Sequence, residues 1–427
     1  MGLRLRLSIM MFLQYAIWGA WLPILYPFLS GFRKFSDAQI GWIFAAGAAG
    51  AIVGPFIAGQ VADRWMATEK FLALCHLAGA ALVWQLASVD SYQSFLVLSL
   101  VYGLIYTPTL ALTNSLSLHH LEKPDRDFGP IRVWGTVGWI AVGIGMGQWL
   151  LMRHTPADAT QAAIEAAQNA GRADAFRLSA ILGAVMGLFC FTLPHTPPSK
   201  NAPEGNASMR AIREAGRQPL LALFLIAIPV SIVHQFYFVH TSGFLTQIQN
   251  SGVGGEGFSS TVNRLFGVGG GGLMTIGQMA EMLVLAIMPV LAKTVGRKGL
   301  LLIGLLAYAA RMALFAYVST SLPAIMLGLA MHGLCFGCFI FVAYLVVDEN
   351  TTKDVRASTQ NLFNLVIFGI GIIVGSKFAG YVGEWAKDDA GAMDFQKLFS
   401  VPMWIALGCF LVMLLIYPNR KPQETPA

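Results

Sequence analysis

A carboxylic acid and an amide lie three residues apart inside a long apolar stretch of the sequence. Gln278 and Glu281 fall within residues 273–291, a run long enough to cross a bilayer, which takes roughly 20 mostly apolar residues. An ionised side chain at that depth costs on the order of 2–3 kcal/mol, so such residues mark functional sites by default. The spacing puts both side chains on one face of a helix. Together they offer donors and acceptors to a polar solute, and the acid can also carry a proton.

The composition is typical of a membrane protein with many helices. Of the 427 residues, 56% are hydrophobic and only 12% are charged, against about 25% charged in soluble domains. The 45 glycines suit close packing of membrane helices, and the long unbroken apolar runs exclude a β-barrel, whose strands alternate. The net charge of +6 comes from basic residues scattered through loops, so we expect the lipid bilayer and no nucleic acid as a partner.

Twelve apolar segments are predicted to span the membrane. They cover residues 8–29, 38–61, 70–88, 93–118, 131–152, 177–194, 219–243, 271–292, 299–318, 322–346, 357–383 and 398–417. A stretch rich in Pro, Ser, Asn and charge follows the sixth segment, which predicts an N-terminal six-helix bundle at 1–195, a cytoplasmic linker at 196–217, and a second six-helix bundle with a short cytoplasmic tail at 218–427. Lys and Arg gather in the loops on the side of both termini, so both termini are predicted to be cytoplasmic.

We expect no cofactor, no metal and no enzymatic activity. Cys335 and Cys338 have the spacing of redox and metal motifs, but they lie in an apolar segment without a second cysteine pair. The glycine-rich run 267–272 lacks the Lys-Ser/Thr ending of a phosphate loop. We interpret it as a flexible outer loop.

The loop after the second segment resembles a signature of the major facilitator superfamily. Gly59, Asp63 and Arg64 match a glycine that permits close helix approach and an Asp-Arg pair that latches neighbouring helices, although residues 65–70 replace the usual basic run. The resemblance implies a gating role for these three residues. It also implies an all-α membrane fold of twelve transmembrane helices in two six-helix bundles, related by an axis along the membrane normal.

Longer motifs resemble bacterial permeases of the nucleoside:proton symporter family, and together they extend over most of the chain. They are Phe12–Trp21, Pro130–Gly138, Gln278–Glu281, Arg311–Tyr317 and Val355–Gln360. Pro130 further predicts that the fifth helix begins at this residue, because proline suits the first helical position.

The resemblance implies a substrate site between the two bundles. The positions that carry over by motif are Arg132, Thr136, Gln235, Gln278 and Glu281, with Glu281 as the proton-coupling residue. Trp139 follows the threonine by three residues and is predicted to stack on a nucleobase, which is worth roughly 1–3 kcal/mol. The predicted substrate site also includes Gln14, His332 and Phe336.

Some of these residues have structural alternatives that the sequence leaves open. Arg132 can reach the membrane interface with its charged end. Glu281 can pair with Arg132 or Arg311, and His332 can be a packed, hydrogen-bonded residue. Gln14 can join two helices by a hydrogen bond.

Two polar positions of the family pattern are absent from this sequence. Gly337 stands in the place of an aspartate in the tenth segment, and Phe238 in the place of an asparagine in the seventh. The resemblance implies import of nucleosides with protons by alternating access, by a monomer in the cell inner membrane. Gly337 keeps open an uncoupled facilitator, or a porter for another polar solute such as a sugar. A non-transporting receptor is less expected, because no loop or tail is long enough to hold a signalling domain.

Overall fold

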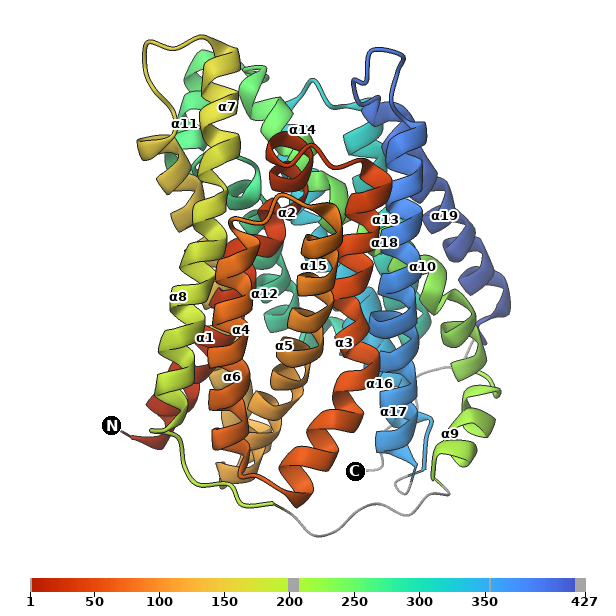
Figure 1. Ribbon diagram of the computed structural model, residues 1–427. Coiled ribbons are helices and arrows are strands. Elements are labelled where there is room, and N and C mark those ends of the chain that lie inside the picture. Colours follow the sequence, from red (N-terminus) through yellow and green to blue (C-terminus); the bar gives the residue numbers. More distant parts are fainter. Residues whose placement is uncertain (1, 199–206, 353–354, 419–427) are drawn as a thin grey trace. The chain divides into compact units, whose positions relative to one another are not determined.

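The computed structural model describes residues 2–198, 207–352 and 355–418, with side chains described for all of these except 54–64, 125, 207–209, 256 and 357. Almost all of the described chain is helical (Figure 1). Extended backbone pairs only in an isolated bridge between Lys387 and Met393 within this part. The prediction of an all-helical membrane protein is therefore confirmed.

The first half of the chain begins with an interrupted helix and continues in longer ones. Its elements are α1 (Leu3–Trp21), η1 (Leu22–Ile24), α2 (Leu25–Pro27), η2 (Phe28–Phe32), α3 (Asp37–Arg64), α4 (Thr68–Leu86), α5 (Tyr92–His120), α6 (Pro124–Arg153), α7 (Gln161–Gly171) and α8 (Ala173–Cys190). The first helix is interrupted near Pro23 and Pro27, because proline cannot donate the backbone hydrogen bond.

The second half of the chain likewise consists of long helices and shorter helical segments. Its elements are α9 (Ala207–Ala215), α10 (Leu220–Asn250), α11 (Glu256–Phe266), α12 (Gly271–Thr294), α13 (Arg297–Tyr317), α14 (Leu322–Ala330), α15 (His332–Leu334), η3 (Cys335–Phe341), α16 (Val342–Glu349), α17 (Arg356–Asn364), η4 (Leu365–Ile370), α18 (Gly371–Trp385) and α19 (Phe395–Ile416). The wide π-helical turns η3 and η4 interrupt two membrane-crossing helices, and such turns are frequent at functional sites.

Ten helices in the described part are long and apolar enough to cross a membrane. The other two predicted segments, 38–61 and 70–88, coincide with α3 and α4. Within α3, the part whose side chains are described, Asp37–Val53, is apolar but shorter than the ten helices above. Polar residues at both ends of α4 lower its mean hydropathy. The full count of twelve stays a prediction.

The prediction that a helix begins at Pro130 is wrong. Helix α6 begins at Pro124 and has Pro130 inside it. Pro124 provides the first-position proline that the motif suggested, and Pro130 only removes one backbone donor from the second turn. Arg132 is therefore more than two turns inside its helix.

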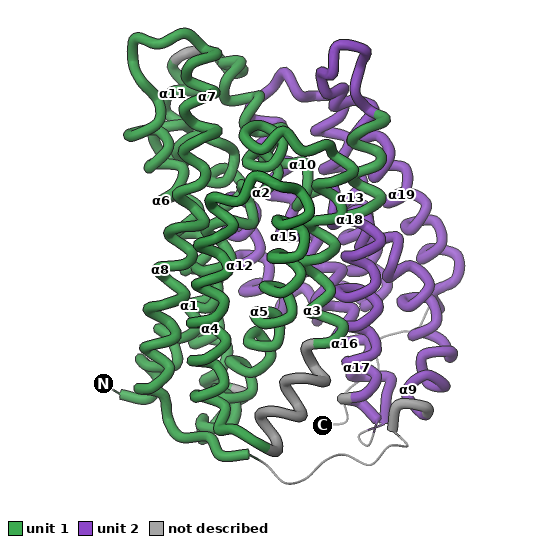
Figure 2. Tube along the Cα trace, viewed as in Figure 1, with its two compact units in different colours: residues 1–202, 237–275, 376–385 green, residues 203–236, 276–375, 386–427 purple. Residues whose placement is uncertain are grey.

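Close contacts divide the chain into two compact units (Figure 2). Unit 1 comprises residues 1–202, 237–275 and 376–385, and unit 2 comprises residues 203–236, 276–375 and 386–427. The units do not follow the two sequence halves, because parts of α10, α12 and α18 and all of α11 pack with the N-terminal helices. The predicted domain boundaries at 195 and 218 stay a prediction.

Within unit 1, hydrogen bonds join the N-terminal helices to these later segments. The Arg172 guanidinium donates to the Thr246 hydroxyl at 3.2 Å, and the Asp37 backbone N–H donates to a carboxylate oxygen of Glu384 at 3.1 Å. The Gln148 amide donates to the backbone carbonyl of residue 264 at 2.7 Å. We call these three bonds the unit 1 seam.

The glycine-rich run is packed and is not the flexible loop that the sequence suggested. Gly267, Gly269 and Gly270 have φ angles of 74°, 85° and 82°, which other residues rarely adopt. A Cβ atom on Gly270 would lie 2.2 Å from the Ser242 carbonyl oxygen. Glycine here permits a tight turn that seats the start of α12 against α10 within unit 1.

Candidate substrate and proton site

The predicted site residues fall into two groups, one in each unit. Arg132, Thr136 and Trp139 lie in unit 1, and Gln235, Gln278 and Glu281 lie in unit 2. Each group is built by different helices. The groups are therefore described separately.

In unit 1, α1 and α6 bring a cation and aromatic rings together. The guanidinium carbon of Arg132 lies 4.1 Å from the centre of the Tyr15 ring, within the range of a cation–π contact. Trp18 and Trp139 meet edge to face with ring centres 5.6 Å apart. Thr136 is partly exposed one helical turn after Arg132. This face presents one positive charge, the hydroxyls of Thr136 and Tyr15 and several ring surfaces, which suits an aromatic solute with polar groups.

Trp139 is only 8% exposed, whereas Trp18 is partly exposed. Trp18 therefore has more exposed surface than Trp139. Sequence reasoning selected Trp139 and missed Trp18 and Tyr15, although both belong to the Phe12–Trp21 motif.

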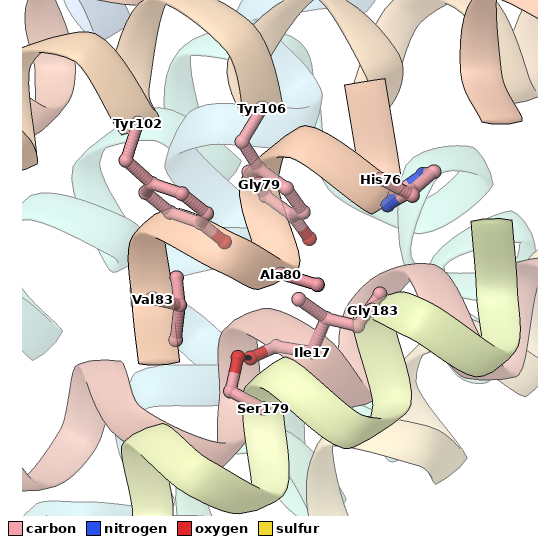
Figure 3. Close-up of a pocket in the computed structure, with 9 residues that line it drawn as sticks. All are labelled: Ile17, His76, Gly79, Ala80, Val83, Tyr102, Tyr106, Ser179 and Gly183. Atoms are coloured by element: carbon pink, nitrogen blue, oxygen red, sulfur yellow. Dashed lines mark hydrogen bonds between the residues drawn. The ribbon is translucent and has the colours of Figure 1, made fainter. Parts of the chain in front are cut away.

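Gln14 lies in a polar network inside unit 1. Its amide nitrogen donates to the Thr109 hydroxyl at 2.8 Å, and its amide oxygen lies 3.0 Å from Nε2 of His76. The Tyr106 hydroxyl donates to the Gln14 backbone carbonyl. Beside this network a narrow pocket is lined by nine residues, among them His76, Tyr106 and Ser179 (Figure 3). Gln14 is fully buried, so its amide holds α1, α4 and α5 together, the alternative that the sequence left open.

In unit 2, the amides and the acid lie on two helices. Gln278 is buried on α12, and the Glu281 side chain, one turn further on, is 18% exposed. Gln235 is buried on α10, where a Cβ atom on Gly375 of α18 would lie 3.0 Å from its Cγ. The motif prediction that Gln278 and Glu281 share a helix is confirmed.

A cluster of charged and aromatic residues lies next to Glu281 in unit 2. Nε2 of His332 lies 3.8 Å from a carboxylate oxygen of Glu281, and Nδ1 of the same ring lies 3.0 Å from a guanidinium nitrogen of Arg311. A Cβ atom on Gly333 would lie 2.4 Å from the Ala280 carbonyl oxygen. Only glycine at 333 lets α15 approach α12 this closely, and this approach brings His332 next to Glu281.

The cluster continues to a second histidine. The His234 and His332 rings are stacked with centres 5.6 Å apart, and Nδ1 of His234 lies 2.8 Å from the Tyr308 hydroxyl. The Arg311 guanidinium lies 5.1 Å from the centre of the Tyr308 ring. Arg311 is fully buried, so a cation, two imidazoles and an acid share one region inside unit 2.

For the remaining predicted site residues, the structure gives a position but does not assign a role. Phe336 is partly exposed in the η3 turn. The gating residues Gly59, Asp63 and Arg64 lie in α3, and their side chains lie outside the described residues. Sequence reasoning named Arg311 only as an alternative partner of Glu281 and did not include Tyr308, although Arg311 begins one of the family motifs.

Comparisons with known proteins show which family the chain resembles. The profile of the family described as nucleoside H+ symporters matches residues 1–423. The chain is 32% identical over 395 residues to the putative nucleoside transporter YegT of Escherichia coli, covering 89% of this chain and 84% of that protein. It is 28% identical over 415 residues to the nucleoside permease NupG of the same organism, covering 94% of this chain and 92% of that one.

The fold matches a solved transporter as well. The crystal structure of the nucleoside transporter NupG aligns with a TM-score of 0.81 at 25% identity, covering 97% of this chain and 98% of that one. The match extends over nearly the whole length of both proteins. An enzyme and a receptor are therefore disfavoured as interpretations of this chain.

Proposed function

The chain belongs to the nucleoside H+ symporter family, and on this premise we propose that it imports nucleosides together with protons. The observation that carries the proposal is the acid Glu281 on a membrane helix, one turn from Gln278 and in contact with His332. Glu281 can exist with or without a proton. An amide beside it can hydrogen-bond a sugar hydroxyl or a base edge in either state.

We propose that both groups of residues take part in nucleoside binding. On the α1–α6 face, the base stacks on Trp18, Trp139 belongs to the same wall of the site, and Arg132 and Thr136 donate hydrogen bonds. On α10 and α12, Gln235, Gln278 and Glu281 bind polar groups of the nucleoside. The edge-to-face rings and the cation–π contact support this assignment, because both fix the side chains before substrate arrives.

For the architecture we propose that α3 and α4 also cross the membrane. This gives twelve helices in two six-helix bundles, with both termini cytoplasmic in the cell inner membrane. The excess of Lys and Arg in the loops on that side supports the orientation. We also propose that the protein works as a monomer.

Alternating access requires contacts that form and break at each side of the site. We propose that the unit 1 seam is the outer contact of this kind. Arg172 and Glu384, which take part in the seam, fall on the predicted outer side. Its three hydrogen bonds all join N-terminal helices to segments of the second half, which supports a role in closing the outer entrance.

Purified protein in liposomes tests the proposed function. Labelled uridine and adenosine uptake is measured with and without an inward proton gradient, in competition with unlabelled nucleosides and with maltose. The proposal expects gradient-driven accumulation that nucleosides compete for and maltose does not. Equal uptake without the gradient means an uncoupled facilitator, and competition by maltose alone means a sugar porter.

A further inference from the structure

His332 has one nitrogen against a guanidinium and the other toward a carboxylate. Nδ1 lies 3.0 Å from Arg311 and Nε2 lies 3.8 Å from Glu281. An arginine side chain has only donors and keeps its charge in proteins. Nδ1 of His332 must therefore accept this hydrogen bond, and it carries no proton.

The contact with Arg311 determines the chemical form of the ring. With Nδ1 unprotonated, the neutral imidazole carries its hydrogen on Nε2, which is the atom that faces Glu281. A second proton on the ring would have to occupy Nδ1 and break the bond to Arg311. His332 is therefore held as a neutral donor and does not act as a second proton carrier.

The gap between Nε2 and the carboxylate is longer than a hydrogen bond, which for N–H···O ends at about 3.2 Å. The Glu281 side chain is partly exposed, whereas His332 and Arg311 are buried. A small shift of the Glu281 carboxylate can close the gap, while the ring stays fixed between Arg311 and the stacked His234.

We propose that Arg311 and His332 are positioning residues for the coupling carboxylate. Arg311 holds His332 as the Nε2–H form, and His332 donates to Glu281 when the acid is ionised. The transported proton binds a carboxylate oxygen of Glu281 and leaves from it, and the imidazole keeps its own proton throughout. This inference rests on the proposed role of Glu281 in coupling.

The ionisable groups around Arg311 and His332 come from several elements. They are His234 of α10, Glu281 of α12, Tyr308 and Arg311 of α13, and Cys335 of η3. A pH profile of transport therefore reports on the cluster. The test therefore needs variants that replace the Nδ1 and the Nε2 interactions of His332 one at a time.

Two isosteric substitutions make this separation. Asparagine at 332 places an amide near the Nδ1 position, where it can accept from Arg311 but cannot reach Glu281. Glutamine places its amide nitrogen near the Nε2 position and can still donate to Glu281. The exposed His119 of α5 offers a matched control as His119→Asn.

The experiment measures gradient-driven uridine uptake against external pH in proteoliposomes of full-length protein. Exchange of labelled for unlabelled uridine without a gradient is the check that each variant folds and binds. His332→Asn should raise the pH of half-maximal uptake by about one unit, the displacement expected from loss of one hydrogen bond to an ionised group. His332→Gln should shift it less, and His119→Asn should not shift it.

Arg311→Lys gives a second test that does not depend on His332 substitutions. Lysine keeps the positive charge but not the planar fork, so it holds Nδ1 less rigidly and weakens the hydrogen bond from Nε2 to Glu281. The pH of half-maximal uptake should then rise in the same direction as in His332→Asn, but by less.

Equal shifts in His332→Asn and His332→Gln, a larger shift in the glutamine variant, or no shift in either would overturn the inference. An unchanged pH of half-maximal uptake in Arg311→Lys would also count against it. Glu281→Gln, measured in the same experiment, distinguishes failure of this inference from failure of the proposed function. If that variant keeps wild-type gradient-driven uptake, the proposed coupling role of Glu281 fails, whatever the His332 variants do.

Discussion

A Cβ atom on Gly337 would lie 2.5 Å from Cγ1 of Val284, so η3 and α12 touch at the position where the family pattern has an aspartate. A real side chain at 337 cannot fit unless Val284 moves. The charged cluster lies on neighbouring elements, with Arg311 on α13, His332 on α15 and Glu281 on α12.

Gly337→Ala tests this contact. The added methyl group should destabilise the protein by about 1–3 kcal/mol, as overpacking does in a close-packed interior. Gly408→Ala on α19 is the matched control, because its added Cβ would meet nothing within 4 Å. Thermal unfolding in detergent measures both. Val284→Ala should restore the stability of Gly337→Ala, and equal stability of the two glycine variants would contradict the packing account.

The contact between Arg132 and Tyr15 predicts a loss of affinity when the ring is removed. Tyr15→Leu should weaken uridine binding by roughly 2- to 30-fold, because a cation–π contact is worth about 0.5–2 kcal/mol. Tyr15→Phe keeps the ring and should bind almost as well as wild type. Calorimetric titration of purified protein measures both constants. Equal weakening in the two variants would point to the hydroxyl and not to the ring face.

Gln14→Leu is expected to lower stability and leave uridine affinity of the folded protein near wild type. The substitution leaves the Thr109 hydroxyl and the His76 ring without the Gln14 amide as their partner, at a cost of about 1–3 kcal/mol. Thermal unfolding and calorimetric titration on the same preparation separate the two effects. Lost affinity with normal stability would instead support the motif-based prediction that Gln14 binds substrate.

Arg172→Gln should open the seam in unit 1. The guanidinium is buried and donates to Thr246, and loss of one bond to a charged group should make the closed form roughly tenfold less favoured. The readout is labelling of Ser242→Cys by a membrane-impermeant thiol reagent added outside cells, since the five native cysteines are buried. Arg177→Gln, an exposed cation paired with Asp174, is the control. Identical labelling rates in both backgrounds would remove Arg172 from the gate.

The sequence predicted the apolar segments well because mean hydropathy reports directly on burial in a bilayer. It also placed Gln278 and Glu281 on one helix face, since that relationship needs only helical periodicity. It did not predict the bond between Arg311 and His332, which are 21 positions apart on different elements. The sequence also did not show which helices Gln14 contacts, because a motif states which residue is present and not which helix it faces.

The hydrogen-bonded pairs of the unit 1 seam could not be predicted from the sequence for the same reason. Asp37 and Glu384 are 347 positions apart, and nothing in either local sequence indicates the other. The start of α6 was misplaced because the chain has two prolines, Pro124 and Pro130, that both suit a helix beginning. Local rules rank such positions equally, and tertiary packing selects between them.

The most direct test of the account is uridine uptake by proteoliposomes containing wild type or Glu281→Gln, with and without an inward proton gradient. Exchange of labelled for unlabelled uridine is measured on the same vesicles. The account predicts that the gradient drives accumulation only in wild type, while Glu281→Gln still exchanges uridine. Gradient-driven accumulation of the same size in both proteins would contradict the claim that Glu281 carries the coupled proton.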